Sequence, residues 1–444
     1  MLSLRDLLPV TTKLLLKTHT LCYNGFRQNR STWISRRCMS SMEILPASSL
    51  ADFVIKSRKN LETFLRSSAE DKTTVEKDGI WIVIGNEAHD LDSQSCSLAM
   101  SRLIDHKLAL GSRKLVLPVM NVPRAEAGFR KDNLLALELA GLSNHDIIYV
   151  DEIPINDWAK KGCLKLVLCD HNELSPRQVN WSESVKQIYD HHRDVGKYAD
   201  AERCIRFPTG SCSSIVLQQI LESSPELLKD SSLSLLLKAS ILVDTSMLED
   251  EYKTTELDIE MHSKLPPIKL TSVKSDRDLF KQLRKAQKDT TGLSTADIVR
   301  KDLKYATDLS NDCLFAVASV KSTLADLGLT SNTENEAFMK QLSEIMDADK
   351  NNPLDAFFIL CFHNKNYKQL LCGIRTSKSS YLNAEKLDEG LQIGKEYGGL
   401  KIVGKRQAWP SLNGDFEFSL FSLQQPISRK QVLPFLTDCF SSKI

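Results

Sequence analysis

The sequence has no run of about 18 or more apolar residues, the length that a membrane-spanning helix needs, so we expect no membrane span. It has no Cys-x-x-Cys pair and no secretory signal, and its 11 cysteines are scattered. This usage favours a reducing compartment and free thiols over a disulfide framework. There is no internal repeat or low-complexity tract, and the net charge of +1 points to no particular class of partner.

The composition is that of a globular protein. Of 444 residues, 42% are hydrophobic and 26% are charged, which suits two or three packed domains.

The first 42 residues differ from the rest. They contain seven basic residues and a single acid, Asp6, and Ser and Thr are frequent. This composition is typical of a mitochondrial transit peptide, and Arg36 and Arg37 suit a processing site. The alternative is an extension that is not translated, with translation starting at Met39 or Met42. We expect residues 1–42 to be a transit peptide that directs the protein to the mitochondrial matrix, with the cytoplasm as an additional location.

Three predicted strands end in polar side chains that packing alone does not require. Residues 185–192 read VKQIYDHH, residues 164–172 read LKLVLCDHN, and residues 80–93 read IWIVIGNEAHDLDS. In an open α/β sheet, ligands bind at the carboxyl ends of the strands. Oxygen and imidazole donors at three such ends predict a metal site.

Strands and helices alternate along the first part of the chain, which implies βαβ units and a mostly parallel sheet. The composition changes at 261–275, where two prolines and several lysines without an apolar face predict a linker. The remainder, 276–444, predicts a second α/β domain. Besides the strands ending near 172 and 192, we expect strands at 80–85, 114–122, 147–150, 313–320, 356–361, 369–375 and 416–420, and helices at 50–65, 94–108, 131–142 and 156–160.

Two further segments carry polar groups in unusual places. Asp244 interrupts a long apolar helix predicted over 232–247, where a lone carboxylate costs free energy unless it is paired or coordinated. We therefore expect Asp244 to coordinate a metal. Gly210 and Ser211 open a helix in the segment GSCSS, whose N–H groups either hold an anion or are simply capped by the serine. Taken alone, this segment favours the cap.

The predicted donors form one set with a recognisable chemistry. Carboxylates with a single imidazole suit manganese or magnesium better than zinc. Two such ions sharing one carboxylate are the arrangement for in-line attack on phosphorus. The predicted metal ligands are Asn86, Asp90, Asp92, Asp170, His191 and Asp244.

Four of these segments, GNEAHDLDS, LCDHN, YDHH and ILVDTS, resemble the motifs of the DHH phosphoesterase superfamily. The nearest branch holds exopolyphosphatases, prune and family II inorganic pyrophosphatases, and the fungal-type exopolyphosphatases are most similar. The segment 284–302 and ISRKQVLPFL at 427–436 add to this resemblance. It implies an α/β fold with an N-terminal DHH domain (43–260), a linker (261–275) and a mixed-sheet DHH-associated domain (276–444), with the active site in the cleft between the domains.

The resemblance also implies roles for single residues. Asp170 falls on the aspartate that bridges two metals, and Asp190 on a residue that orients the histidines. His192 faces the transferred phosphate. The remaining implied ligands are Asp90, Asp92, His191 and Asp244, and Asn86 stands where pyrophosphatases carry a histidine.

The basic residues of the second domain complete the implied site. Arg429 and Lys430 fall on the pair that clamps phosphate, and Lys285 on another phosphate-binding lysine. A local length difference leaves Arg284 or Lys288 as alternatives to Lys285. Outside the motifs, Arg130, Gly210 and Ser211 are candidate substrate contacts, with a solvated helix start as the alternative for Arg130.

Asn86 and the tail SRKQ depart from the pyrophosphatase pattern and favour an exopolyphosphatase. We therefore expect an enzyme with two divalent metal ions, manganese or magnesium, that releases orthophosphate from the end of inorganic polyphosphate. The alternative is a prune-type phosphodiesterase, or a hydrolase of short polyphosphates or nucleotides. A third interpretation, an inactive interaction protein, conflicts with the metal positions, which are intact apart from Asn86. We expect no nucleic acid polymer as a partner, and a monomer.

Overall fold

The computed structural model describes residues 49–108, 115–308, 313–328, 336–347, 353–364, 366–378, 385, 387–389, 406–409, 415–424 and 427–440. The chain divides into a unit of residues 1–45 and a unit of residues 46–444. The predicted transit peptide, residues 1–42, lies outside the described residues and stays a prediction.

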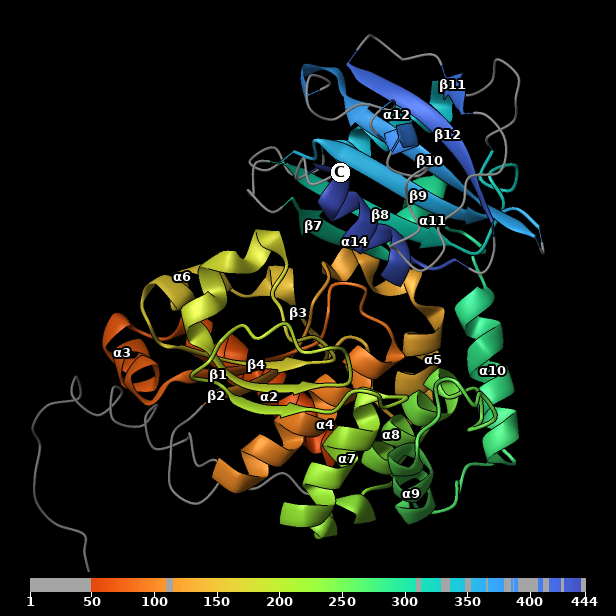
Figure 1. Ribbon diagram of the computed structural model, residues 1–444. Coiled ribbons are helices and arrows are strands. Elements are labelled where there is room, and N and C mark those ends of the chain that lie inside the picture. Colours follow the sequence, from red (N-terminus) through yellow and green to blue (C-terminus); the bar gives the residue numbers. More distant parts are fainter. Residues whose placement is uncertain are drawn as a thin grey trace, which may run out of the picture. The chain divides into compact units, whose positions relative to one another are not determined.

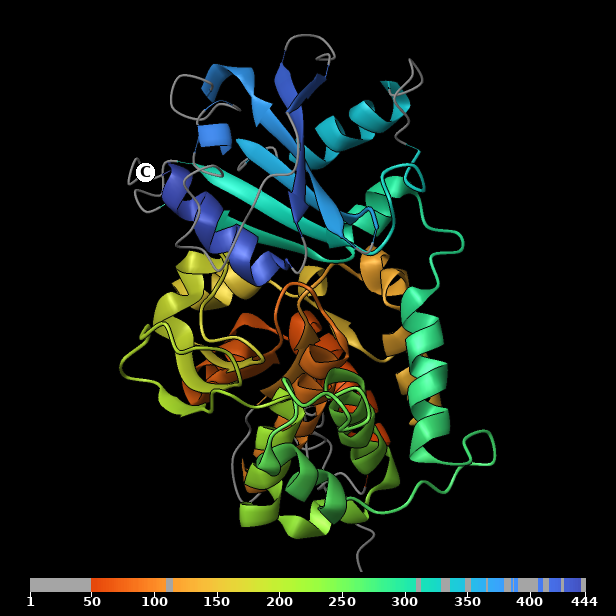
Figure 2. The same ribbon diagram turned by 45° about the vertical axis from the view of Figure 1, so that its right-hand side comes forward.

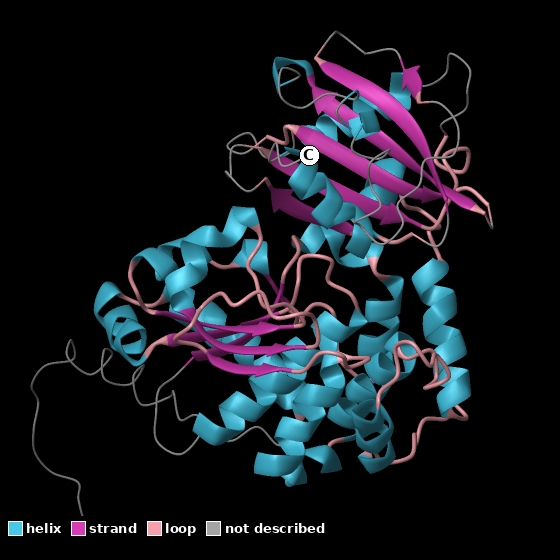
Figure 3. Cartoon of the chain, viewed as in Figure 1, coloured by secondary structure: helices cyan, strands magenta, loops and turns pink. Residues whose placement is uncertain are grey.

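The first sheet is built of parallel strands, as expected (Figures 1 and 3). Its spatial order is β3-β2-β1-β4-β5-β6, and every recorded pairing between neighbours is parallel. The strands are β1 (Ile80–Ile84), β2 (Leu115–Met120), β3 (Ile148–Tyr149), β4 (Leu164–Cys169), β5 (Val185–Asp190) and β6 (Glu202–Ile205).

Helices cover both faces of this sheet, so its strands are apolar on both sides. In β1, Val83 packs into one core and Ile82 into the other, as the two-residue period of a strand requires. The helices are α2 (Leu50–Arg66), α3 (Ala69–Asp78), α4 (Leu91–Leu108), α5 (Lys131–Leu139), α6 (Ile155–Lys160), α7 (Cys212–Ser223), α8 (Ser231–Asp244), α9 (Glu256–Lys264) and α10 (Asp276–Lys288).

The second sheet is mixed, again as expected. Its order is β11-β12-β10-β9-β8-β7, and β8 pairs with β9 in parallel while the other recorded pairs are antiparallel. Its elements are β7 (Leu303–Thr307), β8 (Leu314–Val320), β9 (Ala356–Phe362), β10 (Tyr367–Arg375), β11 (Gln407–Trp409) and β12 (Phe416–Gln424), with helices α11 (Thr295–Arg300), α12 (Glu336–Met346) and α14 (Arg429–Phe440).

Some element limits differ from the sequence-based prediction. The helix expected from residue 94 begins at Leu91, so Asp92 lies in its first turn and not in the preceding loop. The short strands β6, β7 and β11 were not expected, because three to five residues carry too little periodicity to be recognised. None of the described helices is long and apolar enough to cross a membrane.

The packing adds a detail near the predicted linker. α9 runs into the segment 261–275, and Leu265 and Val273 are buried in the first core. Helix α10 packs on α5 and α8, and its Leu279 and Leu283 are buried in the first core. Figure 2 shows α10 beside α5. The limits predicted for the two domains remain predictions. Helix α10 falls in the segment assigned to the second domain, and it packs against helices that cover the first sheet.

Candidate metal centre

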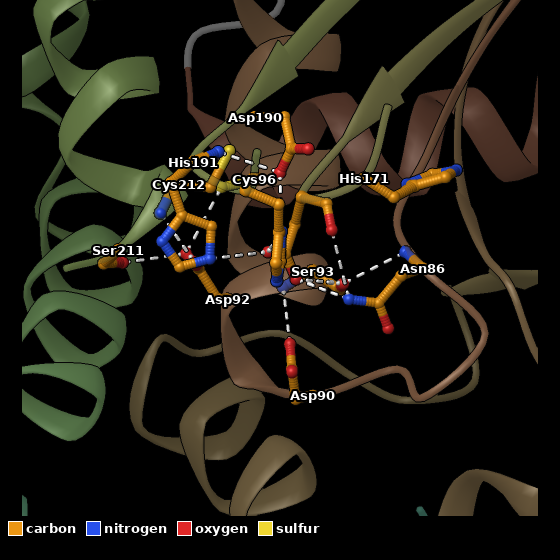
Figure 4. Close-up of polar contacts among 12 residues, drawn as sticks. Asn86, Asp90, Asp92, Ser93, Cys96, His171, Asp190, His191, Ser211 and Cys212 are labelled. Carbon is orange, nitrogen blue, oxygen red and sulfur yellow. Dashed lines mark hydrogen bonds and ion pairs between the residues drawn. The ribbon is translucent and has the colours of Figure 1, made fainter. Parts of the chain in front are cut away.

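The polar ends of three neighbouring strands meet in the structure. β1, β4 and β5 are adjacent in the sheet, so the residues that follow them share one edge. Asn86 Nδ2 donates to Asp170 Oδ2 at 2.7 Å, and His191 Nε2 lies 3.2 Å from Asp170 Oδ1. Figure 4 shows Asn86, Asp92 and His191 gathered in this group.

Asp170 occupies the centre of the group. Its backbone has a φ of 62°, in the left-handed region that Asp and Asn tolerate better than most residues. Its buried carboxylate also accepts from Ser93 Oγ at 2.7 Å. Burial, and then the carboxylates of Asp90 and Asp92, raise the pKa of Asp170 well above its usual value. Full ionisation of Asp170 therefore requires a cation close by.

His191 is a cationic group in contact with Asp170. Its Nδ1 lies 3.0 Å from the carbonyl oxygen of Thr209, which directs Nε2 toward Asp170. Burial opposes charge on the ring, but the bond to Asp170 and the carboxylates of Asp170, Asp92 and Asp244 outweigh it and raise the pKa of His191 to about 10. A bound divalent ion would take over this balancing role from the imidazolium proton.

Asp244 gives the clearest indication that the group fits a metal. One of its carboxylate oxygens, Oδ2, is buried and has no hydrogen-bond partner among the described residues. Burial, then Asp92 and Asp90, raise the pKa of Asp244 well above its usual value. Asp244 is also the last residue of α8, at the negative end of the helix dipole. An unpartnered buried oxygen among carboxylates suits a divalent cation.

Asp190 holds the two histidines in place. It is fully buried, and its Oδ1 accepts from the backbone N–H of His191 and lies 2.8 Å from His192 Nδ1. Burial would raise the pKa of Asp190, but His192 and Asn172 lower it to about 2. Four potential metal-ligand atoms lie within 4.8 Å of one another, one each from Asp170, Asp190, His191 and His192. These bonds orient His191 and His192 at the end of β5.

Asp90 lies at the same edge and is half-buried. Its Oδ1 accepts from the backbone N–H of Ser93 at 3.0 Å. Burial acts to raise the pKa of Asp90, but Arg130, the Ser93 N–H and Lys304 lower it overall. Asp90 therefore supplies an ionised carboxylate beside Asp170.

Asp92, which was also predicted as a ligand from the segment GNEAHDLDS, accepts hydrogen bonds from α7 and α8. Its Oδ1 accepts from Ser213 N at 2.9 Å and from Ser240 Oγ at 2.8 Å, and its Oδ2 from Cys212 N at 2.7 Å. These bonds stabilise the start of α7 from a neighbouring helix. The described contacts of Asp92 thus fix the helices behind the site, and Oδ2 retains capacity for a further partner.

Gly210 and Ser211 also have structural partners. The N–H groups of Gly210 and Ser211 donate to the carboxylate of Asp258, and Ser211 Oγ accepts from Ser213 N at the N-cap of α7. A Cβ on Gly210 would lie 2.7 Å from the carbonyl oxygen of Lys253. The N–H groups expected to meet a substrate anion already serve carboxylates of the chain, which supports the N-cap alternative.

Asn86 reaches the site with its amide nitrogen. Its Oδ1 accepts from Ala88 N at 2.9 Å, while Nδ2 donates to Asp170. In this orientation Asn86 positions Asp170, and its predicted role as a metal ligand depends on the remaining lone pair of Oδ1.

Two arginines from different parts of the chain meet at Asp302. Arg429 NH1 lies 3.0 Å from Asp302 Oδ1, and Arg130 NH2 lies 3.7 Å from the same atom. Arg130 Nε also donates to the carbonyl oxygen of Ala88, in the loop after β1. Lys430 follows Arg429 in the first turn of α14, but its side chain lies outside the described part.

The third predicted basic residue, Lys285, lies on the exposed side of α10. No contact links it to the carboxylate group among the described residues. Its neighbour Arg284, the alternative, points inward and donates to the carbonyl oxygen of Val243 at 2.6 Å, next to Asp244.

Lys304 was missed by the sequence-based prediction. It lies in β7, two residues after Asp302, and lines a cavity of about 990 Å³ together with Asn86 and His171. Burial and then Arg429 lower its pKa, while Asp170 and Asp90 act to raise it. The sequence signal was weak, because Lys304 stands in the short segment RKDLK, in which Asp302 precedes the strand that begins at Leu303.

Comparisons with known proteins agree with this architecture. Residues 81–245 match the model of the DHH family, N-terminal domain, and residues 281–439 match the DHHA2 domain. The chain is 28% identical over 373 residues to the exopolyphosphatase PRUNE1 of Rattus norvegicus, covering 81% of this chain and 75% of the relative. It is also 28% identical over 367 residues to a putative exopolyphosphatase of Schizosaccharomyces pombe, covering 80% and 90%.

A solved structure shows the same fold. The putative family II inorganic pyrophosphatase of Methanococcus jannaschii superposes with a TM-score of 0.51 at 17% identity, covering 82% of this chain and 100% of that one. Both domains of the fold are therefore accounted for by independent comparisons. The chain belongs to the DHH phosphoesterase family of hydrolases, with a DHH domain followed by a DHHA2 domain.

Proposed function

We propose that the protein is a metal-dependent exopolyphosphatase that removes the terminal phosphate of inorganic polyphosphate as orthophosphate. The observation that carries this proposal is a buried carboxylate group with an unpartnered oxygen on Asp244, beside the cations Arg429 and Lys304. The names of the relatives from rat and fission yeast support the same substrate class.

The proposed cofactors are two divalent ions, manganese or magnesium. The residues that would hold them are Asp90, Asp92, Asp170, His191 and Asp244, with Asn86 bonded to Asp170. When bound, such ions activate water for attack and neutralise phosphoryl oxygens.

The chain's own residues account for the rest of the chemistry. Asp190, with its pKa of about 2, is ionised and accepts a hydrogen bond from Nδ1–H of His192. Burial lowers the pKa of His192, so the neutral ring leaves Nε2 free to accept a proton. Arg429, Lys304 and Arg130 supply positive charge for the phosphates of the shortened chain as it leaves.

A phosphate-release assay tests the proposal. Pyrophosphate, triphosphate, long polyphosphate and cyclic AMP are compared with manganese, with magnesium and with a chelator. We expect metal-dependent release of phosphate from polyphosphate at the highest kcat/KM. A preference for cyclic AMP would favour the phosphodiesterase alternative, and no hydrolysis in any metal would favour an interaction protein.

Asn86 is expected to influence the balance between polyphosphate and pyrophosphate. Asn86→His places an imidazole beside Asp170, and imidazole suits manganese better than magnesium. Pyrophosphate has too few phosphates to reach distant cations and depends more on the metals. We therefore expect a several-fold rise in the pyrophosphate-to-polyphosphate ratio of kcat/KM, largest in manganese.

Asn86→Gln, which keeps an amide, is the matched control for this substitution. An unchanged or lower ratio for Asn86→His in both metals would show that the discrimination lies in the DHHA2 domain. The mitochondrial location and the monomeric state remain part of the proposal.

A further inference from the structure

Three cations converge on Gln287 near the end of α10. Arg284 NH1 donates to Gln287 Oε1 at 2.8 Å, and Lys321 Nζ lies 3.5 Å from the same oxygen. Lys301 Nζ donates to the backbone oxygen of Gln287 at 2.7 Å. The three come from α10, the turn after β8 and the end of α11, so only the fold brings them together. We call Arg284, Lys301 and Lys321 the Gln287 cluster.

The Gln287 cluster has a surplus of positive charge. Burial lowers the pKa of Lys301 to about 8, with Arg130 and Lys321 adding to the shift and Asp132 opposing it. Burial, then Arg284, also lower the pKa of Lys321, while Asp302 and Asp132 act to raise it. The bonds to Gln287 use neutral oxygens, so they satisfy donors without balancing the charge. Lys321 is exposed, and an anion from solvent can therefore reach the cluster.

The cluster connects to the candidate metal centre through charged side chains. Lys301 precedes Asp302, whose Oδ1 lies near both Arg130 and Arg429. Asp302 also acts to raise the pKa of Lys304, two residues further along the chain. Positively charged side chains therefore lie between the carboxylate group and the exposed Lys321 of the second domain.

The wide cavity beside the site offers a different environment. The cavity of about 990 Å³ is mixed in charge, because Glu87, Glu173 and Asp308 lie among its cations. A polyanion that extends from the metal centre is therefore attracted more strongly toward the Gln287 cluster than into this cavity.

We propose that the Gln287 cluster is an anion site that binds phosphates of the polyphosphate chain beyond the one that is cleaved. The inference rests on the proposed function, since it names the part of the same substrate that these cations bind. The site gives a long chain affinity that a short chain lacks.

The test compares long polyphosphate with triphosphate in a double variant, Lys301→Gln with Lys321→Gln. We expect the ratio of KM for long polyphosphate to KM for triphosphate to rise about tenfold, since two charged contacts are lost. The salt dependence of KM for long polyphosphate should weaken as well. Lys281→Gln, an exposed lysine one turn earlier on α10, is the matched control and should leave the ratio unchanged.

Direct binding separates this inference from the proposed function. Fluorescently labelled long polyphosphate is titrated against the full chain carrying Asp170→Asn, so that the probe is not consumed. Weaker binding after Lys301→Gln with Lys321→Gln, but not after Lys281→Gln, supports the site even if the protein fails to hydrolyse polyphosphate. Equal binding by all three proteins, or no binding of polyphosphate at all, would overturn it. If the double variant does not fold, Lys321→Glu alone, at an exposed turn, is compared with Lys281→Gln in the same titration, and only Lys321→Glu should bind polyphosphate more weakly.

Discussion

Replacing Asp170 by asparagine is expected to lower phosphate release from polyphosphate by at least about a hundredfold, because the group at the centre of the carboxylates loses its charge. Asparagine tolerates the left-handed backbone at this position, where φ is 62°, and it nearly matches aspartate in shape. The backbone should therefore stay in place. kcat measured at saturating manganese and magnesium gives the result.

Thermal unfolding supplies the second measurement for Asp170→Asn. Ionisation of Asp170 is opposed by burial and by Asp90 and Asp92, so removing its charge should not lower Tm in the absence of metal. The rise in Tm on adding manganese, which follows from binding to the folded state, should shrink or disappear. Asp200→Asn, at an exposed turn, is the control. Activity above about a hundredth of wild type, with an unchanged metal-induced shift in Tm, would contradict the central role.

Replacing Lys304 by methionine is expected to lower kcat/KM for polyphosphate by about a hundredfold. A single cation or donor aimed at developing phosphoryl charge typically contributes a factor of this size. Lys304 interacts electrostatically with Asp170, Asp90 and Arg429, and its side chain has no recorded hydrogen bond among the described residues. Its ammonium group is therefore available to a phosphate oxygen.

The fold should tolerate this change. Burial and Arg429 lower the pKa of Lys304, so its charged form costs stability and methionine should not lower Tm at neutral pH. Lys304→Arg should restore part of the activity, because it keeps the charge with a different shape. Lys340→Met, on the exposed side of α12, serves as the control. A loss of activity that tracks a fall in Tm, without recovery in Lys304→Arg, would assign Lys304 a structural role only.

The sequence by itself determined the fold class, and it predicted that polar groups gather at one edge of the first sheet. Strands ending at Cys169 and Asp190 were recognisable because apolar runs stop at polar residues, and parallel strands place such ends at one edge. The position of Asp244 within an apolar helix was also visible, since a buried carboxylate without a partner is rare. These features are local, so they can be recognised from the periodicity and the order of neighbouring residues.

Tertiary structure decided which partners these residues have. Asp92 was recognised from the segment GNEAHDLDS, but the sequence did not show its partners. Its hydrogen bonds go to Cys212 and Ser240, which lie more than a hundred residues away. Arg130 and Arg429 come from distant segments and likewise meet at Asp302. Arg284 and Lys321 meet in the same way at Gln287. Such contacts arise from packing of α7, α10 and β7, and residue spacing does not encode them. Hydrogen bonds and charges act over a few ångströms in space, so a site built from several elements is fixed only when those elements pack.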